Sequence, residues 1–400
     1  MPNADKTTKK IVVLGGGIGG MNVLRKLKDL KNISATLIDP HLFHICKPAL
    51  HEVAAGSLAP KDNGFPFTEL ARKFNFNFIQ AKSQSIDTNT RTIQLSTGDV
   101  IDYDWLVIAC GAVPNVFHIE GVEEHAYFLN NTADADDIYK KVQIGVRAAS
   151  QQKRSFKVAV IGGGPTGVQL TAELYKTFAK RHSPSIDVSI VEGAPKLLPS
   201  FAENIGLNAA KRLAQLPVNV CLNAQVSKAT PEGIFLKDET FIPADMVIWT
   251  AGVKANTSLK VLLPDFEFAR NGALVVRNTL QTTKDPRILA VGDCAFIADK
   301  PLPPTAQVAR KEGIYVQQTA LPALLEGKTP ESFVYQDQGS IVVLAQYAGW
   351  AELPSGKTYG GKGLGNCFAH FLHNCLFIRQ QYELGGLSFV VKKFLKKKLS

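Results

Sequence analysis

The stretch KIVVLGGGIGG, residues 10–20, carries an apolar segment of β-strand composition straight into a turn in which five of six residues are glycine. A helical pattern follows at residues 21–28, and a second apolar strand, residues 34–38, ends at Asp39. The glycines of the turn are spaced G-x-G-x-x-G. Because a strand precedes this spacing, and a helix and an acidic residue follow it, the stretch predicts a βαβ unit that binds a dinucleotide.

The glycines of this turn have separate tasks. Gly15 permits the tight turn, Gly17 lets the backbone approach a pyrophosphate, and Gly20 allows the helix to pack closely on the strand. The N-terminus of the helix offers free N–H groups and the positive end of its dipole to the phosphates. Asp39, 19 residues after the last glycine, can accept hydrogen bonds from a ribose diol. The cofactor contacts predicted in the turn are Gly15, Gly16, Gly17, Ile18, Gly19 and Gly20.

The same pattern occurs a second time. FKVAVI, residues 156–161, leads into GGGPTG, residues 162–167, then a helical pattern, and then a strand, residues 186–191, that ends at Glu192. Two such units in one chain predict an α/β protein with two Rossmann-like domains and two bound dinucleotides. Glu192 favours NADH over NADPH because it accepts ribose hydroxyls and repels a 2′-phosphate. The contacts predicted here are Gly162, Gly164, Pro165, Thr166, Gly167 and Glu192.

Length and composition set the broad class of protein. A chain of 400 residues exceeds one compact core, so we expect two or three domains. With 45% hydrophobic and 20% charged residues, the chain is globular rather than disordered or fibrous. The polar start MPNADKTTKK is not typical of a secretory signal peptide, and there is no run of about 18 apolar residues to predict a membrane-spanning helix.

Cysteines and histidines give no sign of a metal site. The six cysteines are scattered without CxxC or CxxxxC spacing, which fits buried thiols in a reducing compartment. His41, His44 and His51 are close in sequence but have no acidic or cysteine partner at helical spacing. We therefore expect ordinary loop histidines and no bound metal.

The chain is basic, and much of the excess lies near its C-terminal end. The net charge is +10, and from residue 379 onward there are six Lys or Arg against one acidic residue. Apolar residues recur there at i, i+3, i+4 and i+7, which predicts an amphipathic helix in a membrane interface; the alternative is a helix packed on the protein with a basic tip. No zinc-finger spacing or RNA-binding aromatic motif is present, so we expect no nucleic acid partner. The apolar stripe consists of Leu387, Val390, Val391 and Phe394.

With its other strand ends included, the chain resembles the flavoproteins with two dinucleotide-binding domains, which hold FAD in the first domain and NAD(P)H in the second. Besides the glycine turns, the resemblance is carried by Ala109-Cys110-Gly111, Trp249-Thr250-Ala251-Gly252 and Gly292-Asp293. It spans about residues 10–330 and implies that the second domain is inserted in the first. The expected domains are an FAD domain at 1–117 and 271–330, an NADH domain at 118–270, and C-terminal strands with an amphipathic membrane-docking region at 331–400.

Within that superfamily, the chain is most similar to type II NADH dehydrogenase, the single-subunit NADH:quinone oxidoreductase. Three stretches carry this resemblance: LHEVAAG at 50–56, VIWTAGVKA at 247–255, and AQVA at 306–309, which matches the start of the family's AQxAxQ signature. The resemblance implies hydride transfer from NADH to FAD and then two electrons to a quinone, without proton pumping. It also implies a peripheral respiratory-chain enzyme on the cytoplasmic face of the inner (cell) membrane, with NAD(H), a quinone and the membrane surface as partners; homodimers are common among such proteins.

The resemblance assigns roles near the flavin. Asp293 bonds the ribityl chain of FAD in the family. Ala306 and Gln307 open a helix that points its N-terminus at the pyrimidine end of the flavin, where the dipole would stabilise negative charge, with Thr305 as the N-cap. Gln307 also lies toward the quinone. The other expected contacts are Ala109, Gly111 and Gly252 at strand ends, and Lys47, which either reaches the FAD phosphate or ribose or is a solvated loop lysine.

Two positions depart from the family pattern. Gln169 stands where the family has a Glu near the nicotinamide carboxamide; it can hydrogen-bond the amide but cannot act as a charge or a base, whereas Glu173, one turn on, is retained. Lys311 stands where the family has its second Gln. Its cation could bond a quinone carbonyl or stabilise a quinolate, or it could indicate a different acceptor. The expected catalytic set is Gln169, Glu173, Gln307 and Lys311.

These departures keep a second function open, namely a soluble NADH-dependent flavoprotein reductase with a protein or small-molecule acceptor. A sulfide:quinone oxidoreductase is disfavoured because no cysteine lies between residues 110 and 221, and a disulfide reductase because no CxxxxC follows the first glycine turn. An NADH-sensing flavoprotein without enzymatic activity is a further alternative.

Overall fold

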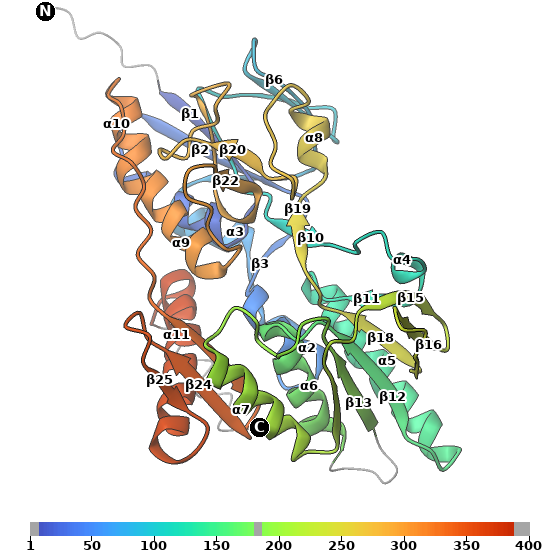
Figure 1. Ribbon diagram of the computed structural model, residues 1–400. Coiled ribbons are helices and arrows are strands. Elements are labelled where there is room, and N and C mark those ends of the chain that lie inside the picture. The colour runs from blue at the N-terminus through green and yellow to red at the C-terminus, as the bar shows by residue number, and fades with distance from the viewer. Residues whose placement is uncertain (1–7, 180–185, 388–400) are drawn as a thin grey trace, which may run out of the picture. The chain divides into compact units, whose positions relative to one another are not determined.

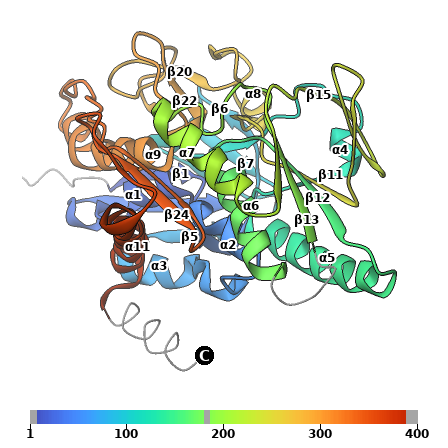
Figure 2. The ribbon, with the colours of Figure 1, turned by 60° about the horizontal axis from the view of Figure 1, so that its bottom comes forward.

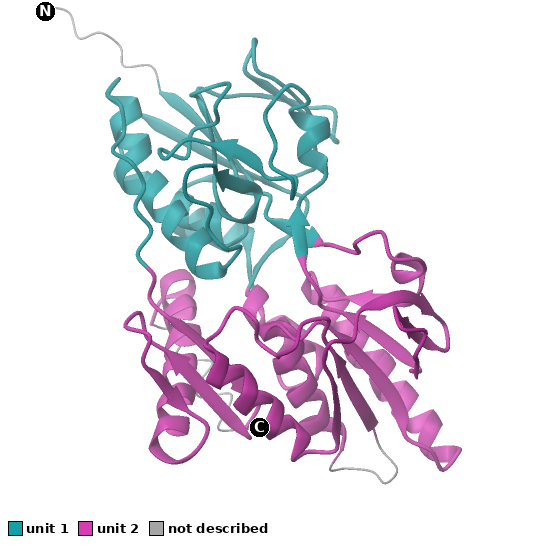
Figure 3. Ribbon diagram, viewed as in Figure 1, with its two compact units in different colours: residues 1–45, 64–113, 253–336 teal, residues 46–63, 114–252, 337–400 magenta. Residues whose placement is uncertain are grey.

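A computed structural model describes residues 8–179 and 186–387 of the chain (Figure 1). The chain folds into two compact units (Figure 3). The first consists of residues 1–45, 64–113 and 253–336, and the second of residues 46–63, 114–252 and 337–400. Each unit therefore contains one of the two glycine turns.

The first unit is organised around a five-stranded parallel sheet in the order β21-β9-β1-β2-β5. β1 is central, with Val12 paired to Thr36 on one side and to Leu106 on the other. Residues 11–14 are buried without alternation, as expected for a parallel strand that is covered on both faces. The strands are β1 (Lys9–Leu14), β2 (Ile33–Asp39), β5 (Asn77–Gln80), β9 (Trp105–Ile108) and β21 (Ile288–Ala290).

The second unit repeats this layout with a parallel sheet in the order β11-β18-β12-β13-β14. The strand before the glycine turn is again central, since Val160 of β12 pairs with Ile190 and with Ile248. In both sheets the turn and the acid therefore lie at the carboxyl edge, where ligands bind in open parallel sheets. The strands are β11 (Ala126–Phe128), β12 (Phe156–Ile161), β13 (Ile186–Val191), β14 (Val218–Cys221) and β18 (Met246–Trp249).

Helices and short strands surround the first sheet, and α1 packs against α9. The helices are α1 (Ile18–Leu24), α3 (Phe67–Phe74), α8 (Ser258–Leu262), α9 (Ala306–Tyr315) and α10 (Leu321–Leu325), with 3-10 turns at Leu27–Asp29 and Gly292–Cys294 and a π-helical turn at Val316–Ala320. The short strands are β3 (Phe43–Ile45), β4 (Gly64–Pro66), β6 (Ser83–Asp87), β7 (Thr92–Leu95), β8 (Val100–Asp102), β10 (Ala112–Pro114), β19 (Val253–Ala255), β20 (Leu274–Val276) and β22 (Ala295–Ile297).

The second unit adds two three-stranded antiparallel sheets and longer helices. Its helices are α2 (Leu50–Ala54), α4 (Val122–His125), α5 (Thr132–Gln151), α6 (Pro165–Phe178), α7 (Glu203–Ala214) and α11 (Gly363–Gly385), with 3-10 turns at Lys47–Ala49 and Pro60–Asp62. The antiparallel strands are β15 (Val226–Thr230), β16 (Gly233–Leu236), β17 (Phe241–Pro243), β23 (Ser340–Leu344), β24 (Ala348–Glu352) and β25 (Thr358–Gly360).

The C-terminal region shares the hydrophobic core of the second unit. Val342, Leu344 and Trp350 belong to one buried cluster with Ile190 and Ile205. α11 packs against β24, and Figure 2 shows the two elements beside each other. The strands predicted at the end of the chain are therefore covered on one side by the dinucleotide-binding fold and on the other by α11.

Several elements differ from those expected. The helix predicted at residues 21–28 is α1, which begins inside the glycine turn at Ile18 and ends at Leu24. Residues 331–339 have strand-like composition but form no strand, and β23 begins only at Ser340. Segment 46–63 lies in the second compact unit, whereas the sequence prediction included it in the FAD domain. In the C-terminal region, α11 ends at Gly385, before the predicted apolar stripe. Most of that stripe (Val390, Val391 and Phe394) lies outside the described residues.

Candidate active site

The first glycine turn joins β1 to α1 and is shaped by close backbone contacts. Gly15 has φ +101°, and a Cβ there would lie 2.4 Å from the Ala109 carbonyl oxygen. A Cβ on Gly20 would lie 2.0 Å from the Gly15 carbonyl oxygen, so glycine is needed for this approach of α1. Gly17 differs, because a Cβ there would meet no protein atom within 4 Å. This open space fits a pyrophosphate that approaches the backbone.

The second turn, between β12 and α6, has the same geometry. A Cβ on Gly167 would lie 1.9 Å from the Gly162 carbonyl oxygen, whereas Gly164 faces open space. Pro165 and Thr166 form the first positions of α6, where proline is favoured because its fixed φ suits the helix and no N–H is lost. Each unit thus has its own cradle for a dinucleotide.

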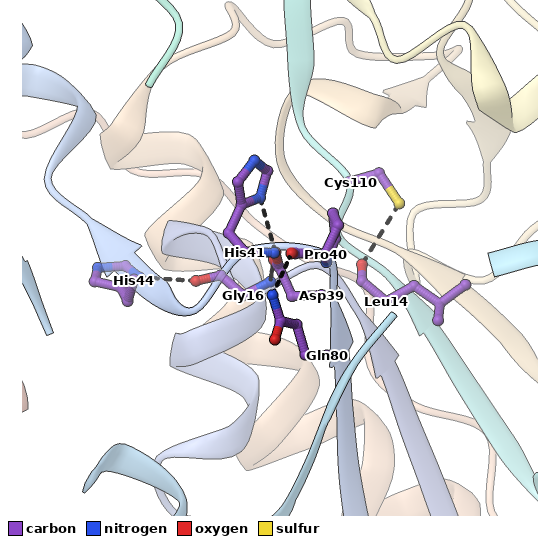
Figure 4. A network of polar contacts seen from close by, with 8 residues as sticks. All are labelled: Leu14, Gly16, Asp39, Pro40, His41, His44, Gln80 and Cys110. Atoms are coloured by element: carbon purple, nitrogen blue, oxygen red, sulfur yellow. Dashed lines mark hydrogen bonds and ion pairs between the residues drawn. The ribbon is translucent and has the colours of Figure 1, made fainter. Parts of the chain in front are cut away.

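Asp39 ties the first turn to the loop that follows β2. Its Oδ2 accepts a hydrogen bond from the Gly16 N–H at 2.7 Å, and its Oδ1 accepts one from the His41 backbone N–H at 2.8 Å (Figure 4). Nδ1 of the His41 ring lies 2.9 Å from the same Oδ1. Since a carboxylate oxygen has two lone pairs, Oδ2 can still accept a ribose hydroxyl.

His44 holds the other side of this turn, a role that the sequence did not predict. Its Nδ1 donates to the Gly16 carbonyl oxygen at 2.8 Å, which fixes the ring tautomer (Figure 4). Burial lowers the pKa of His44, although the bond to Gly16 and the charge of Asp39 act in the opposite direction. His44 is therefore a neutral structural donor beside the dinucleotide cradle. The signal that could have found it is its place between two apolar residues, Phe43 and Ile45, in a short stretch that begins four residues after Asp39.

Glu192 performs the task of Asp39 in the second unit. Its Oε2 accepts from the Gly163 N–H at 2.6 Å and its Oε1 from the Ala194 N–H at 2.7 Å. In both units the acid thus binds the second residue of the glycine turn. The carboxylate is fixed before any ribose arrives, so less ordering is required on binding.

Asp293 lies in the 3-10 turn Gly292–Cys294, at the carboxyl end of β21. The turn is anchored by Glu312 of α9, whose Oε2 accepts from the Gly292 N–H at 2.5 Å. The Glu312 side chain is buried, and this burial raises its pKa to about 8, with Asp293 adding to the rise and the Gly292 bond opposing it. Sequence reasoning missed Glu312, although its spacing from Val308 and Ala309 places it on the buried face of α9.

α9 begins as the sequence predicted. The Thr305 side chain accepts from the Val308 N–H at 3.2 Å, which confirms Thr305 as the N-cap. Ala306 is exposed at the first helical position and Gln307 is half-buried. Oε1 of Gln307 accepts a hydrogen bond from the Tyr335 hydroxyl at 2.9 Å.

Lys311 contacts its own unit. Its ammonium donates to the Gln336 carbonyl oxygen and lies 5.5 Å from the centroid of the Tyr335 ring. The cation that replaces the second Gln of the signature is thus engaged with residues 335–336. These contacts within the chain account for the position of the Lys311 side chain without a bound electron acceptor.

Gln169 and Glu173 are both buried on α6. Glu173 accepts a hydrogen bond from the Ser57 hydroxyl and forms an ion pair with Lys176 at 3.1 Å. These contacts join α6 to segment 46–63 within the second unit. Glu173 is therefore paired and hydrogen-bonded, which is the condition under which a charge is tolerated in a protein interior.

The remaining predicted contacts lie at chain bends. Gly111 and Gly252 have φ +64° and +68°, respectively, and each follows a central-sheet strand end. Ala109 is buried, with its carbonyl against Gly15. Lys47 donates to the Asn130 side-chain oxygen at 3.0 Å in the second unit.

The thiols near the first turn are protonated. Burial raises the pKa of Cys110 far above its ordinary value and that of Cys294 to about 12. Cys110 donates weakly to the Leu14 carbonyl oxygen at 3.6 Å (Figure 4). Both act as small packing groups at neutral pH. Within residues 8–179 and 186–387, no three His, Cys, Asp or Glu side chains gather into a potential metal site.

The fold and the paired turns define a class of oxidoreductase. Residues 9–313 match the family model described as Pyridine nucleotide-disulphide oxidoreductase. The chain is 32% identical to the type II NADH:quinone oxidoreductase of Haemophilus influenzae, covering 94% of each chain. It is 29% identical to the enzyme of that name from Staphylococcus aureus, covering 96% of this chain and 98% of the relative. The chain therefore belongs to the type II NADH:quinone oxidoreductase family.

Solved structures share its fold. NDH2 from Plasmodium falciparum, in complex with NADH, superposes with a TM-score of 0.86 at 23% identity over 98% of both chains. The sulfide:quinone oxidoreductase of Aquifex aeolicus superposes with a TM-score of 0.76 at 20% identity, over 95% of this chain and 92% of the other. These findings confirm the family and the α/β fold with two Rossmann-like domains. The membrane-docking segment and the roles of single site residues stay predictions.

Proposed function

We propose that the protein is an FAD-dependent NADH:quinone oxidoreductase in which the first unit holds FAD and the second binds NADH. The observation that carries this proposal is the pair of open glycine cradles, each with its acid bonded to the turn, in a chain of the type II family. FAD, when bound, accepts a hydride from NADH and passes two electrons to the quinone. The residues of this chain bind and orient the two dinucleotides and the acceptor.

On the NADH side, the second unit supplies specificity and orientation. The Glu192 carboxylate accepts ribose hydroxyls and would repel a 2′-phosphate. Gln169 can hydrogen-bond a carboxamide through its own amide without carrying charge. Because Glu173 is bonded to Ser57 and Lys176, we propose that it orders α6 and segment 46–63 rather than exchanging a proton.

On the acceptor side, the start of α9 is the proposed contact. The first N–H groups of this ten-residue helix carry the positive end of its dipole. They would stabilise negative charge on the flavin next to Gln307. The Gln307 side chain is then placed to hydrogen-bond a quinone carbonyl.

Steady-state oxidation of NADH with a panel of quinones and soluble acceptors tests this function. We expect quinones to serve and NADPH to be a poor donor. Turnover only with soluble acceptors would instead support a soluble flavoprotein reductase. Flavin that is reduced by NADH but reoxidised by none of the acceptors would support an NADH-sensing flavoprotein.

We further propose that α11 docks the enzyme on a membrane surface. Four exposed apolar side chains lie within about 60° of one another on this helix at 100° per residue, and they are Leu364, Phe368, Phe371 and Tyr382. The opposite face, with Ala369, Gln381 and Leu384, is buried in the second unit. The attachment that we propose is peripheral, through this exposed face of α11. Among the described residues, no helix has the length and hydropathy of a membrane-spanning segment.

Charge supports the same assignment. Leu387 is 68% exposed at the end of the described residues, and five lysines follow it in the sequence. Each lysine near an anionic surface adds about 1 kcal/mol of attraction. We also propose that the enzyme attaches to the cytoplasmic face of the cell membrane and forms a homodimer. Binding to vesicles tests the membrane attachment, and analytical sedimentation tests the dimer.

Replacing Phe371 by Ser should weaken binding to anionic vesicles by about tenfold, because a phenyl ring leaves the apolar boundary. Phe371 is 62% exposed, so folding should be little affected. The measurement is co-sedimentation of the holoenzyme with phosphatidylglycerol vesicles. Ile144→Ser, which removes an equally exposed apolar side chain from α5, is the matched control. Equal losses in the two variants would argue against α11 as the docking surface.

A further inference from the structure

Residues 331–336 belong to no helix or strand and contact side chains of α9 in the first unit; we call this segment the strap. Gln307, Lys311 and Tyr315 are spaced four residues apart, which places them on one face of α9. Each of them contacts the strap. The Tyr315 hydroxyl donates to the Glu331 carbonyl oxygen, and its ring lies 5.3 Å from the ring of Phe333.

The contact at Gln307 has a chemical consequence for the amide. The Tyr335 hydroxyl donates to Oε1 of Gln307 at 2.9 Å. A phenol oxygen can also accept a hydrogen bond, but the Lys311 ammonium over the Tyr335 ring weakens it as an acceptor and strengthens its O–H as a donor. The bond therefore favours the orientation in which the amide oxygen faces Tyr335 and the NH2, a donor, faces away from it.

A hydrogen-bond donor is what a quinone requires. The carbonyl oxygens of a quinone are acceptors, and they gain negative charge as electrons arrive. An amide turned the other way would present its oxygen to that charge and repel it. Fixing the amide in advance removes this wrong orientation before the acceptor binds.

Lys311 contacts the Tyr335 ring and the backbone of the strap. Its ammonium is 5.5 Å from the ring centroid and is held by the Gln336 carbonyl oxygen. A cation over a phenol ring withdraws electron density and strengthens the O–H as a donor. Lys311, Tyr335 and Gln307 thus form one polarised chain that ends at the amide.

We propose that Tyr335 is a positioning residue for the acceptor step: it fixes the Gln307 amide with its NH2 toward the acceptor carbonyl, and Lys311 acts through Tyr335. This proposal rests on the proposed function, in which Gln307 contacts the quinone. It replaces direct contact between Lys311 and the acceptor, which the sequence suggested, by an indirect role.

The test follows the two half-reactions of the holoenzyme separately by stopped-flow absorbance of the flavin, with a short-chain ubiquinone as oxidant. Tyr335→Phe should slow reoxidation about three- to tenfold, which is the effect of one lost hydrogen bond, and leave reduction by NADH unchanged. Affinity for an alkyl-hydroxyquinoline N-oxide, a quinone analogue that takes no electrons, should fall by a similar factor. In a Gln307→Ala background, Tyr335→Phe should have no further effect on either quantity.

Tyr315→Phe is the matched control, because it also removes a tyrosine hydroxyl that holds the strap but does not touch Gln307. If it slows reoxidation as much as Tyr335→Phe does, the strap matters only as a tether and the proposal is wrong. Full additivity of Tyr335→Phe with Gln307→Ala would also overturn it. Failure of the wild-type enzyme to reduce any quinone would instead refute the proposed function.

Discussion

Gly17→Ala is expected to yield a folded protein that retains little or no FAD. Gly17 has φ −67° and ψ −166°, which alanine adopts readily, and its new methyl group would meet no protein atom within 4 Å. The unfolding free energy of the apoprotein should therefore change by less than about 0.5 kcal/mol. The methyl group would occupy the space through which a pyrophosphate approaches the turn. We expect flavin per protein to fall at least tenfold, a loss of about 1.4 kcal/mol or more in binding, measured as flavin released on denaturation.

Two further variants define what this result means. Gly20→Ala places a methyl group 2.0 Å from the Gly15 carbonyl oxygen, so it should lower both stability and flavin content. Gly164→Ala is the counterpart of Gly17→Ala in the second turn, with the same open space. It should keep the flavin and weaken NADH binding. Loss of flavin from Gly164→Ala and retention by Gly17→Ala would reverse the assignment of the two units.

The features that the sequence predicted correctly are those set by local spacing. The two glycine turns and their acids follow from chemistry within about 30 residues, and Thr305 is recognisable as a cap because its side chain bonds an N–H three residues on. The parallel sheets follow from the order of strands and helices. Sequence rules suffice here because the strand–turn–helix–strand motif fixes where each acid meets its glycine turn.

The residues that the sequence did not predict have partners at similar separations in the chain, but no recurrent motif fixes those partners. Glu312 bonds Gly292 and Tyr335 bonds Gln307, and in each case the pairing depends on how α9 lies in its unit. His44 reaches back 28 residues to Gly16. The prediction for Lys311 rests on the family signature alone, and the signature does not indicate that Lys311 contacts the strap. Periodicity indicates which face of a helix is buried, but not which backbone group that face will meet.

Glu312 should make the stability of the first unit depend on pH, and Glu312→Gln should remove that dependence. Burial raises the pKa of Glu312 from its ordinary 4.5 to about 8. Between these values the folded protein holds a proton that the unfolded chain has released. Each unit of pH in this window therefore costs the wild type about 1.4 kcal/mol of unfolding free energy. The stability is present below pH 4.5 and lost as pH rises toward 8.

Glutamine resembles the protonated acid and can accept the same hydrogen bond from Gly292, so Glu312→Gln should match the wild type near pH 5 and exceed it at pH 8. The expected gap at pH 8 is on the order of 4 kcal/mol, which corresponds to a rise of roughly 10 °C in the melting temperature of the apoprotein. Differential scanning calorimetry at both pH values measures it. Glu124→Gln, at an exposed position of α4, is the control and should show no such gap. A Glu312→Gln variant that is less stable than the wild type at both pH values would mean that the carboxylate is ionised in the folded protein and that its charge holds the Gly292–Asp293 turn.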